Sequence, residues 1–357
     1  MSTSAFNSAI TQARDLLRWR SPLRTELWAA RLVSGLEAGD VGGFVRELVG
    51  AGTAEARLTL AALAAVDTAV LSEDDGLEVS DTSVTGAAGP FAAAGREAVE
   101  ALPGWVGRLG QVTCEGAWYG RADPYGQQTL AALRFRYRNG KEPHILVVGI
   151  DQVNGGLAVD ALVEEVKFLD DLNLVPADPG VVAGRVLDAF ELTRRVMGAV
   201  VADTLPAVRP LALARARVVP HPVRPAPDDT VARFRELPGL AGAREAFEKL
   251  VEFVGDRPLW WSPARVSQFL TSWLPREAIL SDEAIAAMPD VVRAWSRFSG
   301  GHAEVLERVD MDAPRLAPLM ADESLAGLGK RIALSRLRAE GGNEGGNGGG
   351  NGGDAGG

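Results

Sequence analysis

Three carboxylates in one short stretch are the residues best spaced to do chemistry in this chain. The segment at 144–165, HILVVGIDQVNGGLAVDALVEE, places Asp151 after an apolar run, Asp160 after a glycine-rich turn, and Glu164 beyond it. An apolar run, a turn and a second alternating run predict a β-hairpin. With either even-length loop that the glycines allow, Asp151 and Asp160 share one face of the sheet, because opposed residues lie on the same side.

These carboxylates have two interpretations. Oxygen ligands suit Mg²⁺ or Mn²⁺, so one hypothesis is a divalent-metal-dependent nuclease or phosphoryl-transfer enzyme that uses Asp151, Asp160 and Glu164. In the other interpretation the aspartates are solvated at the open end of a structural hairpin, with no cofactor and no catalytic role. The chain has three histidines and one cysteine, and none of them lies at metal-ligand spacing. The residue pattern therefore favours the architectural interpretation, with His144 as a hydrogen-bonded structural residue.

Arginines on a predicted strand are the first candidate interaction residues. The segment TLAALRFRYR alternates apolar and basic residues, which puts Arg134, Arg136 and Arg138 on one face. An arginine stripe of this kind is able to contact a nucleic acid backbone or an acidic partner. The simpler expectation is cross-strand pairing with acids on neighbouring strands, Glu115 among them.

Tryptophans are the second candidate interaction residues. Trp260, Trp261 and Trp273 lie in the C-terminal part of the chain, in and before a predicted helix. Their spacing predicts a helical core. If part of this group is exposed, it forms a docking groove or an oligomer contact.

The composition favours some kinds of partner and some cellular compartments over others. A formal net charge of −10 disfavours nucleic acid as a partner, since phosphate binding needs a concentrated basic surface. The single cysteine permits no intramolecular disulfide, which fits a reducing compartment. The N-terminus has no signal-peptide pattern and no apolar run is long enough to span a bilayer. We expect a cytoplasmic protein without membrane contact, with a protein partner or a homo-oligomer as possible assemblies.

The hydrophobic patterning predicts an α+β fold. A central antiparallel β-meander is flanked by N-terminal helices and followed by a helical domain. The glycine-rich end has no large apolar side chain and is expected to be disordered. The expected divisions are an N-terminal helical region at 1–73, a linker and short helix at 74–100, the β-meander at 101–175, a helix packing on the sheet at 176–219, a helical C-terminal domain at 220–340 and a disordered tail at 341–357.

Two blocks of this sequence carry a resemblance to other chains. One is DPYG followed by EPHILVVGIDQVNGGLAVDA at 142–161, and the other is WSPARVSQFLTSWLPR at 261–276 with its continuation to residue 300. The chain resembles a group of uncharacterised actinobacterial proteins with this order of sheet block and helical block. That group has no established activity, and the resemblance therefore implies a domain order only. Similar sequences often have a histidine after the aspartate of VGID, where this chain has Gln152, a difference that weakens a metal-site interpretation.

Composition and motifs together favour a non-enzymatic intracellular scaffold or protein-interaction protein. The first alternative is the divalent-metal-dependent nuclease or phosphoryl-transfer enzyme described above. A weaker alternative is a nucleic-acid-associated regulator that uses the arginine stripe.

Overall fold

The computed structural model describes residues 2–66, 94–95, 98–99, 102–224, 230–255 and 260–344. The chain divides into two compact units, residues 1–226 and residues 227–357, named unit 1 and unit 2 here. Most of the expected linker at 74–100 and residues 345–357 of the expected tail lie outside the described residues. None of the helices in the described ranges is both long and apolar enough to cross a membrane.

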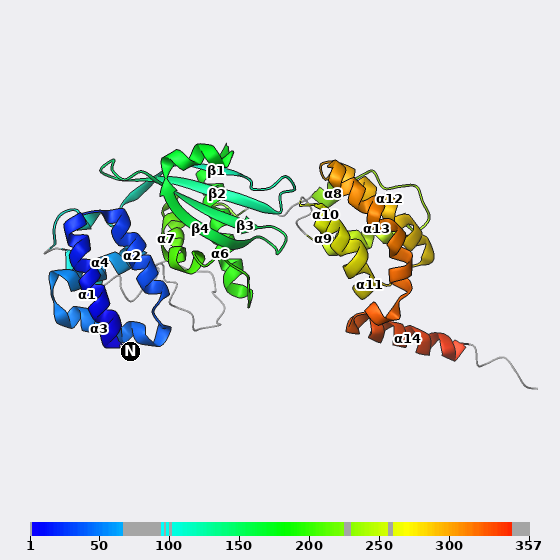
Figure 1. Cartoon of the computed structure of the whole chain (residues 1–357), viewed down its shortest axis with the longest axis horizontal. Coiled ribbons are helices and arrows are strands. Elements are labelled where there is room, and N and C mark those ends of the chain that lie inside the picture. Colours follow the sequence, from blue (N-terminus) through cyan, green and yellow to red (C-terminus); the bar gives the residue numbers. More distant parts are fainter. Residues whose placement is uncertain are drawn as a thin grey trace, which may run out of the picture. The chain divides into compact units, whose positions relative to one another are not determined.

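Unit 1 begins with four helices (Figure 1). Ser21 and Pro22 show why the second helix begins where it does: the Ser21 hydroxyl accepts a hydrogen bond from the Arg24 amide, and proline occupies the first helical turn. The fourth helix is alanine-rich and buried on nearly all sides, so it forms the centre of this helical group. The helices are α1 (Ser2–Trp19), α2 (Pro22–Ser34), α3 (Ala38–Ala51) and α4 (Ala54–Val66).

A five-stranded antiparallel sheet forms the second part of unit 1. Its strand order is β4-β3-β2-β1-β5, so the first four strands are a meander of consecutive hairpins. The fifth strand lies at the opposite edge from β4, and the 3₁₀ segment η2 (Val166–Leu172) connects these two edges. The α+β class and the central antiparallel meander are thereby confirmed. The strands are β1 (Val112–Arg121), β2 (Gln128–Tyr137), β3 (His144–Asp151), β4 (Leu157–Glu165) and β5 (Val175–Ala177).

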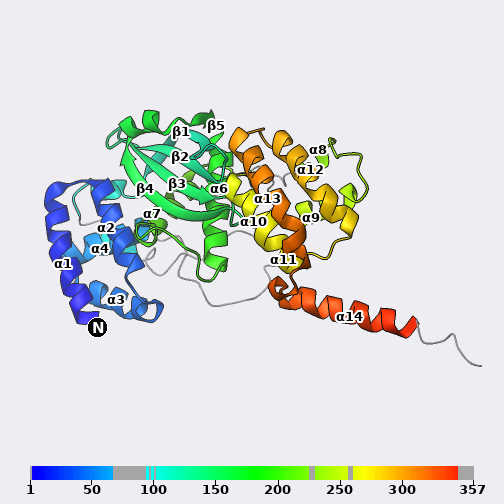
Figure 2. The ribbon, with the colours of Figure 1, turned by 45° about the vertical axis from the view of Figure 1, so that its right-hand side comes forward.

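Both faces of the sheet are covered. Helices α6 (Pro179–Arg195) and α7 (Leu205–Val218) pack on the face that carries Leu133, Phe135 and Leu146. The opposite face carries Ile145 and Val147 and is covered by apolar side chains of the η2 segment. Helix α7 also contacts α2 and α4, so it lies between the N-terminal helices and the sheet (Figures 1 and 2).

The central hairpin differs from both registers expected from the sequence. Asp151 pairs with Leu157 across the loop at 152–156, and Asp160 pairs with Gly149 because Val159 is an extra residue that bulges from β4. The Val159 carbonyl accepts a hydrogen bond of 2.8 Å from the Ala202 amide, so a contact from outside the hairpin holds the bulge. The loop is longer than two residues, so the expected pairing is wrong. The two aspartates still share one face, because Asp160 pairs with Gly149, two residues from Asp151 on β3.

Unit 2 is helical. Its core includes the buried aromatic residues Trp260, Trp261, Phe269 and Trp295, and a π-helical turn lies in the middle of a longer helical stretch. Helix α14 continues to Glu344, into the region expected to be a disordered tail. The elements are α8 (Thr230–Arg233), α9 (Ala243–Val254), α10 (Pro263–Gln268), the π-turn η3 (Phe269–Trp273), α11 (Leu274–Glu277), α12 (Asp282–Phe298), α13 (Ala303–Ala321), η4 (Glu323–Leu325) and α14 (Leu328–Glu344).

Candidate functional site

The Asp151 carboxylate closes the turn of its own hairpin. It accepts hydrogen bonds from the Val153 amide at 2.9 Å, from the Asn154 amide at 3.4 Å and from the Asn154 side-chain amide at 2.7 Å. An aspartate bonded to backbone amides a few residues ahead is a turn-forming arrangement. Asp151 therefore has a local structural role.

The other two carboxylates have separate surroundings. Asp160 accepts a hydrogen bond of 2.6 Å from the Thr204 hydroxyl at the start of α7, and Glu164 is exposed. Within the described ranges, no three histidine, cysteine or acidic side chains lie close enough to hold a metal ion. Asp151, Asp160 and Glu164 consequently do not assemble into the Mg²⁺ or Mn²⁺ site that the metal hypothesis requires.

Two residues of the arginine stripe, Arg134 and Arg136, pair with one glutamate, as the simpler expectation predicts. The Nε atom of Arg134 lies 3.2 Å and that of Arg136 lies 3.0 Å from the two carboxylate oxygens of Glu115. Glu115 is the bulged residue of β1 between the pairs Cys114–Phe135 and Gly116–Arg134, which explains how it lies against both arginines. Arg138 is exposed beyond the end of β2. The stripe is thus partly neutralised within the sheet.

The three candidate tryptophans form part of the unit 2 core. Trp260 and Trp261 are buried, and the Trp261 indole donates a hydrogen bond of 2.8 Å to the Ser296 hydroxyl. Trp273 is half-buried and stacks on Phe269 with ring centroids 5.8 Å apart. Trp260 and Trp261 therefore stabilise unit 2 from within and do not offer a surface to a partner.

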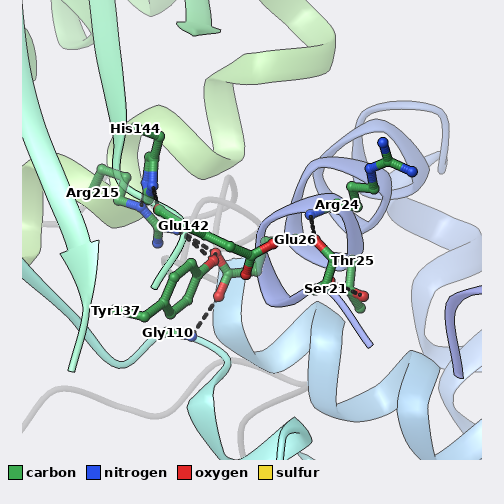
Figure 3. Close-up of polar contacts among 9 residues, drawn as sticks. All are labelled: Ser21, Arg24, Thr25, Glu26, Gly110, Tyr137, Glu142, His144 and Arg215. Atoms are coloured by element: carbon green, nitrogen blue, oxygen red, sulfur yellow. Dashed lines mark hydrogen bonds and ion pairs between the residues drawn. The ribbon is translucent and has the colours of Figure 1, made fainter. Parts of the chain in front are cut away.

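Four buried polar side chains from distant parts of the chain meet in unit 1 (Figure 3). Glu26 of α2, Tyr137 of β2, His144 of β3 and Arg215 of α7 form what we name the buried ionic cluster. Each side chain is at most 2% exposed. The cluster lies where α7 contacts both α2 and the sheet, so it connects the three layers of unit 1.

Every member of the cluster bonds to another member. Arg215 forms an ion pair with Glu26, and its Nη2 also donates to the Tyr137 hydroxyl at 3.1 Å. The Tyr137 hydroxyl donates to Glu26 at 2.6 Å, and the second oxygen of Glu26 accepts from the Gly110 amide at 2.6 Å. A buried ion pair is favourable only when further hydrogen bonds satisfy both ions, and this arrangement supplies them.

Contacts also fix the protonation state of His144. Its Nε2 accepts a hydrogen bond of 3.1 Å from Arg215, so the proton is on Nδ1, which donates to the Glu142 carbonyl at 2.8 Å. Burial, together with the charge of Arg215, lowers the pKa of His144 from 6.5 to about 4. Burial and the nearby Glu26 carboxylate raise the pKa of Tyr137. Both rings are therefore neutral at physiological pH, which suits a structural role and not acid–base catalysis.

Glu142 extends the cluster to the start of α2. Its backbone has a φ of 48°, which is unusual for a residue other than glycine, and its carboxylate accepts a hydrogen bond from the Ser21 hydroxyl. His144 was expected to be structural, whereas Glu26 and Arg215 were not among the predicted site residues. The available signal was spacing: Glu26 precedes the buried Ala29 and Ala30 by three and four residues, so a carboxylate lies on the buried face of α2.

Unit 2 contains an open hollow with room for a partner, which we name the apolar groove. It has a volume of about 780 Å³ and lies between α12, α13 and the first turns of α14. Three acidic residues, Asp282, Asp322 and Glu323, also line it, and all three are exposed. Hydrogen bonds from Ser324 lower the pKa of Asp322, which keeps its carboxylate charged. The main apolar lining residues are Ile285, Pro289, Leu316, Met320 and Leu334.

Lys330 forms part of the groove wall and fixes the start of α14. The side chain is 8% exposed, and its Nζ donates a hydrogen bond of 2.8 Å to the Pro275 carbonyl. The Gly327 amide donates to the Arg276 carbonyl at 2.8 Å, which provides a second anchor beside the first. These two contacts hold the beginning of α14 against α11. Burial of the Lys330 side chain lowers the pKa of its ammonium group.

Comparison with known proteins adds no assignment to this geometry. No protein-family model, no curated protein and no solved structure matches the chain.

Proposed function

We propose that this chain is a non-enzymatic, intracellular protein-interaction protein, whose unit 2 binds an amphipathic cationic helix in the apolar groove. The observation that carries the proposal is the groove itself, an apolar hollow of helix-binding size whose exposed charges are acidic. Hydrophobic grooves between helices are a recurrent binding mode for amphipathic helices, whose anchor residues recur every three or four positions.

The charges of the groove select the kind of helix. Asp282, Asp322 and Glu323 contribute three negative charges to its lining, against one positive charge from the largely buried Lys330. A partner helix with basic residues beside its apolar stripe gains from this potential, while an acidic helix is repelled. The preferred partner therefore combines large aliphatic side chains with lysine or arginine at the edges of the stripe.

Unit 1 supports a scaffold role in this proposal. Its buried ionic cluster joins α2, the sheet and α7 through groups whose hydrogen bonds are satisfied internally. Such an arrangement favours one rigid packing of these layers. Asp151 and Asp160 serve local structure there, and no observation in the described residues favours the nuclease hypothesis over the interaction hypothesis.

Fluorescence anisotropy with two labelled model peptides tests the proposal. One peptide is an amphipathic helix of leucine and lysine, and the other has glutamate in place of lysine. We expect the full chain at high dilution to bind the lysine peptide at least about tenfold more tightly than the glutamate peptide. Ala317→Arg places a cation on an exposed residue that lines the groove and is expected to weaken this binding.

Ala241→Arg is the matched control, because Ala241 is also exposed in unit 2 but does not line the groove. It is expected to leave the affinity for the lysine peptide unchanged. Equal affinity for the two peptides, absence of binding, or equal effects of the two arginine variants would each contradict the proposal.

A further inference from the structure

Helix α14 carries an apolar stripe that no described residue of unit 2 covers. Leu328 is 70% exposed and Ile332 is 45% exposed, and the two residues are one helical turn apart. Beyond its anchored first turns the helix runs away from the rest of unit 2 (Figures 1 and 2). At a rise of about 1.5 Å per residue its 17 residues extend over about 25 Å. It is therefore long enough to reach a neighbouring molecule.

The charges beside this stripe match those of the apolar groove. Arg331 and Arg336 are exposed, and at about 100° per residue they lie on either side of Leu328 and Ile332. The helix has no acidic residue before Glu340. An apolar stripe with arginines at both edges is the complement of an apolar groove with acidic residues.

The stripe faces away from the groove of its own chain. Lys330 and Leu334 form part of the groove wall, and they lie on roughly the opposite side of α14 from Leu328 and Ile332. Since the Lys330 and Gly327 contacts anchor the helix in this orientation, its stripe cannot enter the groove that the same helix lines. A second molecule has to supply the occupant.

We propose that the groove of unit 2 is occupied by α14 of a second copy of this chain. This inference rests on the proposed function, because it names the partner of the same groove. Each chain carries both the stripe and the groove, so two copies satisfy each other by reciprocal exchange around a twofold axis. The exchange covers both exposed apolar surfaces at once and sets their opposite charges against each other. The glycine- and asparagine-rich tail at 345–357 has no large apolar side chain to compete for the groove.

Light scattering after size-exclusion chromatography of the full chain tests the exchange. We expect a dimer for the natural sequence and a monomer for Leu328→Glu/Ile332→Glu, named the stripe variant. The affected side chains are exposed, so the variant is expected to keep its circular dichroism spectrum. Met311→Glu is the matched control: Met311 is 60% exposed on α13 but does not line the groove, and this variant is expected to stay dimeric.

A labelled peptide of residues 325–340 separates this inference from the proposed function. The monomeric stripe variant has a free groove and is expected to bind the peptide, and adding Ala317→Arg is expected to weaken that binding about tenfold or more. A dimer that persists in the stripe variant would overturn the exchange. A natural chain that stays monomeric while its groove binds the leucine–lysine peptide would overturn the exchange and leave the proposed function standing. A monomer that binds neither peptide would overturn both.

Discussion

Arg215 of unit 1 and Lys330 of unit 2 are two buried cations with different kinds of partner. In unit 1, Arg215 is buried against Glu26, Tyr137 and His144, and each of these groups is bonded to another protein group. In unit 2, the buried ammonium of Lys330 bonds to a backbone carbonyl in the wall of an open groove. The comparison indicates that the buried ionic cluster of unit 1 is satisfied internally, whereas unit 2 has an open groove with apolar and acidic lining, which we propose that another molecule fills.

Breaking the ion pair of unit 1 is expected to give the largest effect. Glu26→Gln leaves the guanidinium of Arg215 buried without its counterion, which should lower the free energy of unfolding of unit 1 by about 3–5 kcal/mol. Hydrogen exchange of peptides from β2 and β3 measures the loss, and peptides from α12 serve as the internal reference. Arg195→Ala, at an exposed pair with Glu191, is the control and should cost less than about 1 kcal/mol.

A double substitution sharpens the same test. Glu26→Leu/Arg215→Met removes both charges, and it should destabilise unit 1 less than Glu26→Gln does, because no unpaired ion remains. If the single and double variants were equally unstable, the cluster would contribute packing alone.

Titration of His144 should make unit 1 sensitive to acid. Its pKa is about 4 in the folded chain and near 6.5 in the unfolded chain, so between these values only the unfolded chain binds the proton. Stability should therefore fall as the pH falls from about 6.5 to about 4, by about 3 kcal/mol, with no contribution from this group above that window. Denaturant unfolding across this pH range measures the slope. His144→Gln should flatten it, and His302→Gln in unit 2 should not.

Lys330 is the buried cation of unit 2 to compare with Arg215 of unit 1. Its ammonium is desolvated and bonded to the Pro275 carbonyl, so Lys330→Met keeps the aliphatic stem and removes the cost of burying the charge. We expect the stability of unit 2 to change by no more than about 1 kcal/mol, measured by denaturant unfolding. A loss as large as that of Glu26→Gln would show that the stability of unit 2 depends on the Lys330 ammonium as strongly as that of unit 1 depends on the Arg215–Glu26 pair.

The smallest effect is expected at the arginine stripe. Arg134 and Arg136 share Glu115 at a partly exposed position, and Arg136→Ala should cost less than about 1 kcal/mol because water screens such pairs. Retention of the chain on a heparin column should be unchanged by the substitution. Weaker, salt-dependent retention of the variant would instead support contact with a polyanion through the stripe.

The sequence predicts the local parts of this fold well. The alternation in β2, the apolar run of β3 and the glycine-rich turn are local signals, and the meander follows from them. Strand alternation also places Arg134 and Arg136 on one face, whereas the position of Glu115 against both arginines depends on the bulge of β1. The bulge at Val159 does not, because the Ala202 amide that holds it is distant in sequence.

Local sequence patterns do not predict the contacts in these sites between residues that are distant in the sequence. Glu26 and Arg215 are separated by 189 positions, and only the tertiary fold brings the carboxylate and guanidinium together. Helix α14 lies in a stretch whose glycines and basic residues give weak helical periodicity. Its exposed stripe and the groove wall are properties of how α14 is anchored on α11, which no local spacing encodes.

Hydrogen exchange of the full chain at low and high concentration tests the central claim most directly. The claim is that unit 1 is complete in itself, whereas unit 2 is completed by a second copy. It predicts concentration-dependent protection in α12, α13 and α14, no such change in β2, β3 or α7, and loss of the protection in Leu328→Glu/Ile332→Glu. Protection that is independent of concentration in unit 2, or that appears in unit 1 instead, would contradict it.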